Sequence, residues 1–261
     1  MARKPFRVSI TGVDGSGKDA VARLALQQIS ADNGLTSIKI GRPSYRFEQG
    51  GVTEIYKEVI GPIDRRHRIV GRRGDPHAIV GVGILYFLTQ SRLLEADILE
   101  SDNPPDILAS GRDPRIDVAT YLSYYAPAFV ARTTAQERFD IMQALTGAER
   151  DLVIRLLVEP HIAEARIAAR IQVEEAARQA SGQTSATARD KGRPHEDAPS
   201  LAMLNDAYVS IFDALATSRP ETTIVEIDTN CRLSQDVADL TKFAILQTRD
   251  GAIGPGERRT F

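Results

Sequence analysis

Cysteine and long apolar runs are almost missing from this chain of 261 residues. Cys231 is the only cysteine, so an internal disulfide is excluded and a reducing compartment is expected. No stretch approaches the roughly 18 uninterrupted apolar residues of a membrane-spanning helix. Residues 1–20 also lack the apolar run of a signal peptide. We therefore expect a soluble cytoplasmic protein that has no membrane partner.

The chain also lacks a large excess of charge of either sign. Its 33 basic and 35 acidic residues give a formal net charge of −2, so nucleic acid is not an expected partner. Lysine is scarce, because 27 of the basic residues are arginine. Arginine suits bidentate phosphate binding, although a GC-rich genome explains the count equally well. Residues 64–75 concentrate five arginines, either as a phosphate or nucleic-acid contact or as an exposed loop.

Strand and helix patterns alternate along the chain. β-rich segments predict strands at 7–11, 36–40, 106–110, 152–158 and 223–227. Apolar spacing predicts helices at 18–33, 52–60, 77–100, 117–125, 134–145, 161–180, 201–216 and 234–246. This alternation predicts an α/β fold with a parallel sheet and helices on both faces.

One domain, residues 1–250, is the simplest organisation for this length. Within it, residues 181–199 are polar and lack apolar periodicity, which predicts a flexible lid. Residues 251–261 are expected to form a frayed C-terminal tail.

A glycine-rich turn follows the first predicted strand and opens the first predicted helix. It consists of Gly12, Val13, Asp14, Gly15, Ser16, Gly17 and Lys18. This spacing, with a strand before it and a helix after it, is that of a P-loop. In a P-loop the glycines let backbone N–H groups surround a phosphate, and the lysine contacts the β- and γ-phosphates. The sequence therefore predicts a site for ATP at these residues.

Asp19 departs from the P-loop pattern, which has Ser or Thr after the lysine to bind Mg²⁺. A carboxylate can ligate Mg²⁺ directly, which makes Asp19 the candidate metal ligand. Without a metal, its charge at about 4 Å from a phosphate is repulsive by roughly 4 kcal/mol at an effective dielectric of 20. Asp19 can also simply favour the first helical turn, or mark a site that has lost catalysis.

Several motifs in order resemble the thymidylate kinase family over most of residues 6–230. They are the P-loop variant Gly12–Lys18, the segments 41–43 and 50–53, the helix segment 85–92 that ends in Arg92, and the strand end 110–113 followed by Asp117 and Tyr121. The segment 152–170 is similar to the family's fourth strand and following helix. Two positions differ from the family, which has an aromatic residue at Leu88 and an acidic one at Gly111. These differences concern the choice of thymidine rather than the phosphoryl-transfer scaffold.

The resemblance implies a P-loop NTPase three-layer sandwich and assigns roles to individual residues. Asp14 lies near the acceptor nucleotide and the transferring phosphate, and Arg92 touches the acceptor base. Arg42 and Arg112 grip the acceptor phosphate. Four arginines close over the phosphoryl group, namely Arg166, Arg170, Arg189 and Arg193. Catalysis in such a site is mainly positioning and positive charge around a metal-bridged phosphate chain.

Several of these residues can also be explained by a purely structural role. Phe87 is a candidate base-stacking residue that can equally belong to the core. Arg92 can lie on a helix surface. Arg166 and Arg170 share a helix face that can be simply solvated. His67 and His77 show no spacing typical of metal ligands.

The sequence thus predicts an ATP- and Mg²⁺-dependent kinase whose acceptor is a small nucleotide. A nucleoside monophosphate, by default (d)TMP, is the expected acceptor. Lys18, Asp14, Arg112 and Arg170 are the candidate catalytic residues, and Arg42, Phe87, Arg92, Arg112 and Tyr121 the candidate acceptor contacts. A kinase of another metabolite and a nucleotide-binding protein without catalysis are the alternatives. The sequence leaves the oligomeric state open, including a homodimer.

Overall fold

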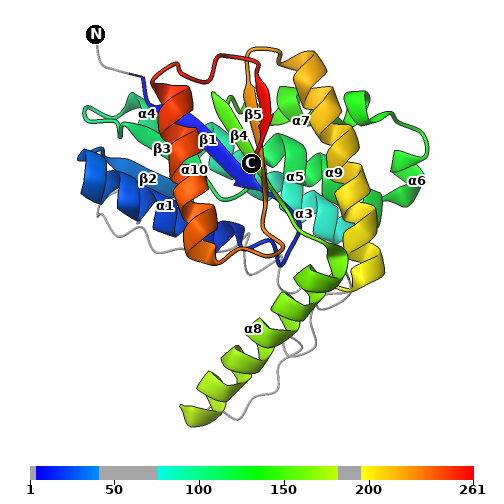
Figure 1. Ribbon diagram of the computed structural model, residues 1–261. Coiled ribbons are helices and arrows are strands. Elements are labelled where there is room, and N and C mark those ends of the chain that lie inside the picture. Colours follow the sequence, from blue (N-terminus) through cyan, green and yellow to red (C-terminus); the bar gives the residue numbers. More distant parts are fainter. Residues whose placement is uncertain (1–3, 41–75, 182–194) are drawn as a thin grey trace.

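The computed structural model describes residues 4–40, 76–181 and 195–261 (Figure 1). Its strands are β1 (Phe6–Thr11), β2 (Ser37–Ile40), β3 (Ile107–Ser110), β4 (Leu152–Leu157), β5 (Thr223–Asp228) and β6 (Arg258–Thr260). They form one sheet in the order β2-β3-β1-β4-β5-β6, and every pairing is parallel. The predicted parallel α/β architecture is therefore confirmed.

Helices cover both faces of this sheet. They are α1 (Lys18–Asn33), α3 (Pro76–Thr89), α4 (Glu95–Glu100), α5 (Pro114–Tyr125), α6 (Pro127–Val130), α7 (Ala135–Thr146), α8 (Pro160–Ala180), α9 (Ala198–Ser218) and α10 (Ser234–Arg249). A π-helical turn, Gln90–Leu94, joins α3 to α4 without a break. The predicted helix 77–100 is therefore continuous and contains one π-helical turn. No helix in the described ranges is long and apolar enough to cross a membrane.

Strand alternation divides the core between the two faces. Val8 and Ile10 of β1 pack with buried residues of α1 and α10. These two helices lie against each other on one face of the sheet (Figure 1). On the other face α5, α7 and α9 form the larger core with Phe139 and Phe212. Because side chains alternate along a strand, Ser9 and Thr11 of β1 point to this second face. Thr11 is buried on this face, where its hydroxyl group bonds to side chains of α5 and α9.

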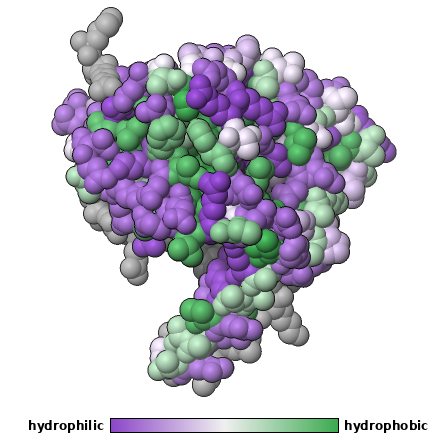
Figure 2. All heavy atoms as spheres, in the orientation of Figure 1, coloured by the Kyte–Doolittle hydropathy of each residue, from purple (hydrophilic) through white to green (hydrophobic). Residues whose placement is uncertain are grey.

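Helix α8 projects from the body, and its outer half carries exposed apolar side chains (Figures 1 and 2). Val173 in this part of α8 is 69% exposed. The predicted helix 52–60, the loop 64–75 and most of the predicted lid 181–199 lie outside the described residues. At the end of that lid, residues 198–199 already belong to α9, so the helix predicted at 201 begins three residues earlier.

The prediction of a frayed C-terminal tail is wrong. Residues 258–260 form the parallel edge strand β6 beside β5, and the N–H of Phe261 donates to the carbonyl oxygen of Glu226 at 2.9 Å. Ile253 is buried, and the Phe261 ring packs edge-on against Phe243. The three strand residues are all exposed, so they show none of the apolar alternation that would have revealed a strand.

Candidate functional site

The glycine turn, residues 12–17, connects the carboxyl end of β1 to the first turn of α1. Gly12, Gly15 and Gly17 have φ angles of 149°, 85° and 85°, which side-chain-bearing residues rarely adopt. A Cβ atom at Gly15 would lie 2.5 Å from the carbonyl oxygen of Ala163 in α8. At Gly12 it would lie 2.7 Å from the carbonyl oxygen of Leu156. The turn therefore needs glycine both for its backbone angles and for its close packing against β4 and α8.

Lys18 begins α1, and its side chain folds back into the glycine turn. Only 4% of the residue is exposed. Its Nζ donates to the carbonyl oxygen of Val13 and to Oδ1 of Asp14, each at 3.3 Å. Burial lowers the pKa of Lys18, although the Asp14 carboxylate acts in the opposite direction. The ammonium is thus held inside the turn by an acidic partner.

Asp14 is the centre of the site and accepts from four side chains. Its Oδ1 accepts from Lys18 Nζ and from Arg112 Nη2 at 3.1 Å. Its Oδ2 accepts from the Tyr121 hydroxyl at 3.2 Å and faces His195 Nε2 at 3.1 Å. Burial works to raise the pKa of Asp14, but Lys18, Arg112 and His195 outweigh it and hold that pKa well below the usual range. The site is therefore a compact network of side chains, among them the cations Lys18 and Arg112, around one buried carboxylate.

Asp117 supplies a second buried carboxylate next to this network and contacts Arg112 from the other side. Its Oδ1 lies 3.6 Å from Arg112 Nη1 and accepts from the Tyr208 hydroxyl at 2.7 Å. Its Oδ2 accepts from Thr11 Oγ1 at 2.8 Å and from the N–H of Asp113 at 2.6 Å. Burial, although opposed by Arg112, raises the pKa of Asp117. Arg112 is consequently fixed between two carboxylates, one in the glycine turn and one in α5.

His195 is one of the site residues that sequence reasoning missed, and Lys39 and Tyr208 are others. His195 is 2% exposed, and its Nδ1 lies 2.6 Å from the hydroxyl oxygen of Tyr125. The rings of Tyr121, Tyr124 and Tyr125 surround it edge-on, with centroids 5.3–5.7 Å away. A lone histidine in a polar stretch carries no motif, so only the folded chain reveals its contact with Asp14. Asp117 and Tyr121, by contrast, could be recognised in the sequence. Their i, i+4 spacing after β3 places both side chains on one face of α5.

Asp14, His195 and Glu196 also bring three potential metal-ligand atoms within 4.8 Å of one another. Each carboxylate already faces a cation, because Asp14 pairs with Lys18 and Arg112, and Glu196 lies 3.4 Å from Arg170. Positive charges this close disfavour a divalent ion at the same place. The cluster is better explained as a charge-paired network than as a cation site.

Asp19 lies at the rim of the site, next to the end of β3. Its side chain is 75% exposed, and its Oδ1 accepts from Lys39 Nζ at 3.0 Å. Partial burial acts to raise the pKa of Asp19, but Lys39, Lys18 and Arg112 lower it overall, so the carboxylate is ionised near neutral pH. An accessible, ionised oxygen donor fits a hard cation such as Mg²⁺.

Of the other predicted contact residues, Arg170 reaches the edge of this network through Glu196, whereas Arg166 bonds elsewhere. Arg166 donates from Nη1 to Thr229 Oγ1 at 3.1 Å and from Nη2 to the Thr229 carbonyl oxygen at 2.6 Å. Arg170 faces Glu196 and Glu174. Phe87 is half-buried against the core of α5, α7 and α9. Arg42, Arg189 and Arg193 lie outside the described residues, so their roles stay predictions.

Arg92 caps the end of α7. Its Nε donates to the carbonyl oxygen of Leu145 at 3.2 Å and its Nη2 to that of Ala144 at 3.1 Å. A basic side chain at this place satisfies carbonyl groups that lack helical partners. Its predicted contact with the acceptor base would require these bonds to be exchanged.

We expect Arg92→Ala to lower the free energy of unfolding by about 1 kcal/mol, because it leaves those carbonyls uncapped. Urea unfolding measures this change. Arg23→Ala on the exposed face of α1 is a matched control, for which we expect a change within about 0.5 kcal/mol. Unchanged stability together with a large rise in acceptor KM would instead assign Arg92 to acceptor binding.

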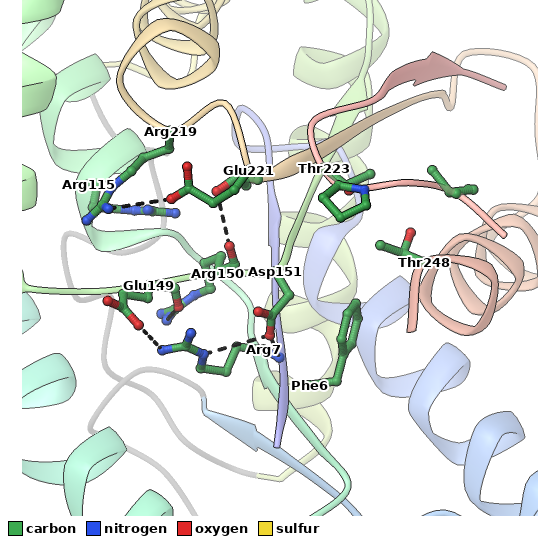
Figure 3. A pocket seen from close by; sticks show the side chains of 13 residues that line it. Phe6, Arg7, Arg115, Glu149, Arg150, Asp151, Arg219, Glu221, Thr223 and Thr248 are labelled. Atoms are coloured by element: carbon green, nitrogen blue, oxygen red, sulfur yellow. Dashed lines mark hydrogen bonds and ion pairs between the residues drawn. The ribbon is translucent and has the colours of Figure 1, made fainter. Parts of the chain in front are cut away.

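A cavity of about 260 Å³ lies at the opposite, amino end of the sheet (Figure 3). Charged side chains on its wall pair with one another, since Arg7 Nη1 donates to Glu149 Oε2 at 2.8 Å and Arg219 Nη1 to Glu221 Oε1 at 3.5 Å. Open α/β sheets bind their ligands at the carboxyl ends of the strands. We therefore place the candidate functional site at the glycine turn rather than in this cavity.

Comparison with known proteins adds no relative: no family model matches the chain, and a search of curated proteins finds no match.

Proposed function

We propose that the protein is an ATP- and Mg²⁺-dependent phosphotransferase whose acceptor is a nucleoside monophosphate, by default (d)TMP. The observation that carries this proposal is the glycine turn at the carboxyl end of β1, with Lys18 and Arg112 converging on Asp14. Backbone N–H groups at the start of α1, together with its helix dipole, favour an anion at this place.

The buried cations account for how such a site can act. Lys18 and Arg112 share the Asp14 carboxylate, and a bound polyphosphate offers them a second, more highly charged partner. Phosphoryl transfer needs little covalent chemistry from the protein, so fixed positive charge and correct positioning supply most of the catalysis. Asp117 and Tyr208 beneath Arg112 keep that charge in place before the ligand arrives.

Asp19 is the residue that we propose to hold Mg²⁺. Mg²⁺ bound there supplies positive charge that offsets the developing charge on the phosphate oxygens. Asp19 uses Oδ1 for Lys39, and Oδ2 has no hydrogen bond to the described part of the chain, which leaves an oxygen for the metal.

An ATP-consumption screen over the common nucleoside monophosphates and nucleosides tests the proposal. We expect ADP release above background with at least one monophosphate. Turnover with a nucleoside or another hydroxyl compound alone would favour a kinase of a different metabolite. Tight nucleotide binding without turnover by any acceptor would favour a binding protein that has lost catalysis, an outcome for which the missing P-loop hydroxyl at position 19 gives a reason.

Replacement of Asp19 tests its role toward the metal. We expect Asp19→Ala to raise the Mg²⁺ concentration needed for half-maximal turnover by about tenfold or more, with a much smaller change in acceptor KM, because a charged oxygen ligand is lost. Asp19→Ser with Gly111→Asp should retain more activity than Asp19→Ser alone, since it returns one carboxylate to this rim. Gly111→Asp alone is the control, because a Cβ at that position lies 3.0 Å from Asp19 Oδ1. Tighter ATP binding by Asp19→Ala with unchanged Mg²⁺ dependence would show that Asp19 only repels phosphate.

A further inference from the structure

Lys39, near the end of β2, places a second lysine at the rim of the glycine turn. Its Nζ donates to Asp19 Oδ1 at 3.0 Å and to the main-chain oxygen of Asp19 at 3.2 Å. An ammonium group has three donors, so one N–H of Lys39 has no hydrogen bond within the described residues. The side chain is 24% exposed, more than those of Lys18 and Arg112, at 5% and 17%. Lys39 is therefore the most accessible of the three cations.

Gly111 makes room for this pair of residues. A Cβ atom there would lie 3.0 Å from Asp19 Oδ1, 3.4 Å from Lys39 Cε and 3.8 Å from Lys39 Nζ. The first of these distances is tighter than an ordinary van der Waals contact, so a larger residue would push the carboxylate aside. The backbone of Gly111 has no positive φ, and space, not backbone strain, is what glycine provides. Asp19, Lys39 and Gly111 thus fit one another as a unit.

The charges of the unit also balance. Asp19 alone would place a negative charge beside the phosphates of a nucleotide, where it repels them. Lys39 cancels this charge at a separation of 3.0 Å. The pair therefore removes the repulsion that an aspartate introduces at this position, even before a metal binds.

We infer that Lys39 is a phosphate-site residue: its ammonium neutralises Asp19 and donates its remaining N–H to the polyphosphate, so that a nucleotide binds without a divalent cation. The inference rests on the proposed function, because it places nucleotide phosphates at the glycine turn. The second carboxylate oxygen of Asp19 would still be available to hold Mg²⁺ in that complex. Lys39 acts here as a binding and positioning residue.

Calorimetric titration of the full chain with ADP, in excess EDTA and in Mg²⁺, tests this inference without relying on turnover. We expect the wild-type Kd in EDTA to lie within about tenfold of that in Mg²⁺. Lys39→Met should weaken ADP binding in EDTA by about 10- to 100-fold, the range expected for a charged hydrogen bond. The loss in Mg²⁺ should be smaller, because the metal then neutralises Asp19. Lys242→Met is the matched control, since Lys242 is equally exposed and pairs with Asp32 elsewhere on the surface.

A double-mutant cycle tests whether Lys39 acts through Asp19. Adding Asp19→Ser to Lys39→Met should recover at least about fivefold in EDTA, because the uncompensated carboxylate is removed. Lys39→Arg should keep most of the affinity, and the thermal unfolding midpoint of each variant reports on folding.

Four results contradict these expectations. A Lys39→Met variant that binds ADP within threefold of wild type in EDTA would overturn the inference. So would a variant that binds Mg²⁺-ADP more tightly with unchanged metal-free affinity, because Lys39 would then only compete with the metal. No recovery in the double variant would overturn the coupling to Asp19. If the wild type bound ADP neither in EDTA nor in Mg²⁺, the proposed function itself would be overturned.

Discussion

Lys18→Ala is expected to abolish triphosphate turnover while the fold survives. The substitution removes a buried ammonium that points into the glycine turn, where a polyphosphate would contact it. Loss of one such electrostatic group in a dry site costs about 10²- to 10³-fold in kcat, and a residue that also binds the substrate costs more. Steady-state ADP release with the best acceptor measures this loss.

Lys4→Ala is the control for Lys18→Ala, because Lys4 is 67% exposed at the amino end of the sheet. We expect it to keep wild-type turnover. The circular dichroism spectrum and the unfolding midpoint of Lys18→Ala must remain near those of the wild type for the comparison to hold. A folded Lys18→Ala protein with near-normal turnover would place the active site elsewhere.

Asp113→Ala is expected to destabilise the protein by about 3–5 kcal/mol. Asp113 is fully buried, accepts from Arg115 Nε at 3.0 Å and Nη2 at 2.8 Å, and caps α5 through the N–H of Arg115. Its loss leaves the guanidinium of Arg115, which is 1% exposed, buried without its carboxylate. Because Asp113 follows Arg112, we also expect turnover to fall by more than the unfolded fraction explains.

The stabilisation by Asp113 should depend on pH with a definite sign. Burial acts to raise the pKa of this carboxyl, but Arg115 and Arg150 outweigh it and lower that pKa far below its unfolded value. Such a group contributes its full stability above the unfolded pKa of about 3.9, and the contribution is lost as the pH falls below that value. The difference in unfolding free energy between wild type and Asp113→Ala should therefore be constant from about pH 5 to pH 7. It should shrink below about pH 4.

Urea unfolding of two further variants checks this explanation. Asp113→Ala with Arg115→Met removes both charges, so it should be less destabilised than Asp113→Ala alone. Asp32→Ala breaks an exposed pair with Lys242 and should cost at most about 1 kcal/mol. If Asp113→Ala were as mild as Asp32→Ala, the buried pair would not be what fixes the segment that carries Arg112.

Local patterns were sufficient for most elements of the fold. The apolar spacing of residues 18–33 and the β-rich run at 152–158 each predicted the observed element to within one residue at either end. The glycines of residues 12–17 also predicted a turn between β1 and α1, and all three of them adopt positive φ angles. These features depend on neighbours within a few positions, and such signals are visible in a sequence.

The edge strand β6 was beyond local reasoning, because an exposed three-residue strand exists only through its pairing with β5. The same holds for Arg92, whose partners are carbonyl groups at the end of α7. A mid-helix arginine looks identical in sequence whether it contacts a ligand, solvent or another helix.

The sequence by itself determined the alternation of strands and helices, the glycine turn and the position of Lys18 directly after it. The tertiary structure alone decided which groups surround that turn: His195 meets Asp14 across 181 positions, and Lys39 meets Asp19 across 20. The physical reason is that backbone periodicity is a property of neighbouring residues, whereas a charge finds its partner only when the sheet brings distant strand ends to one edge.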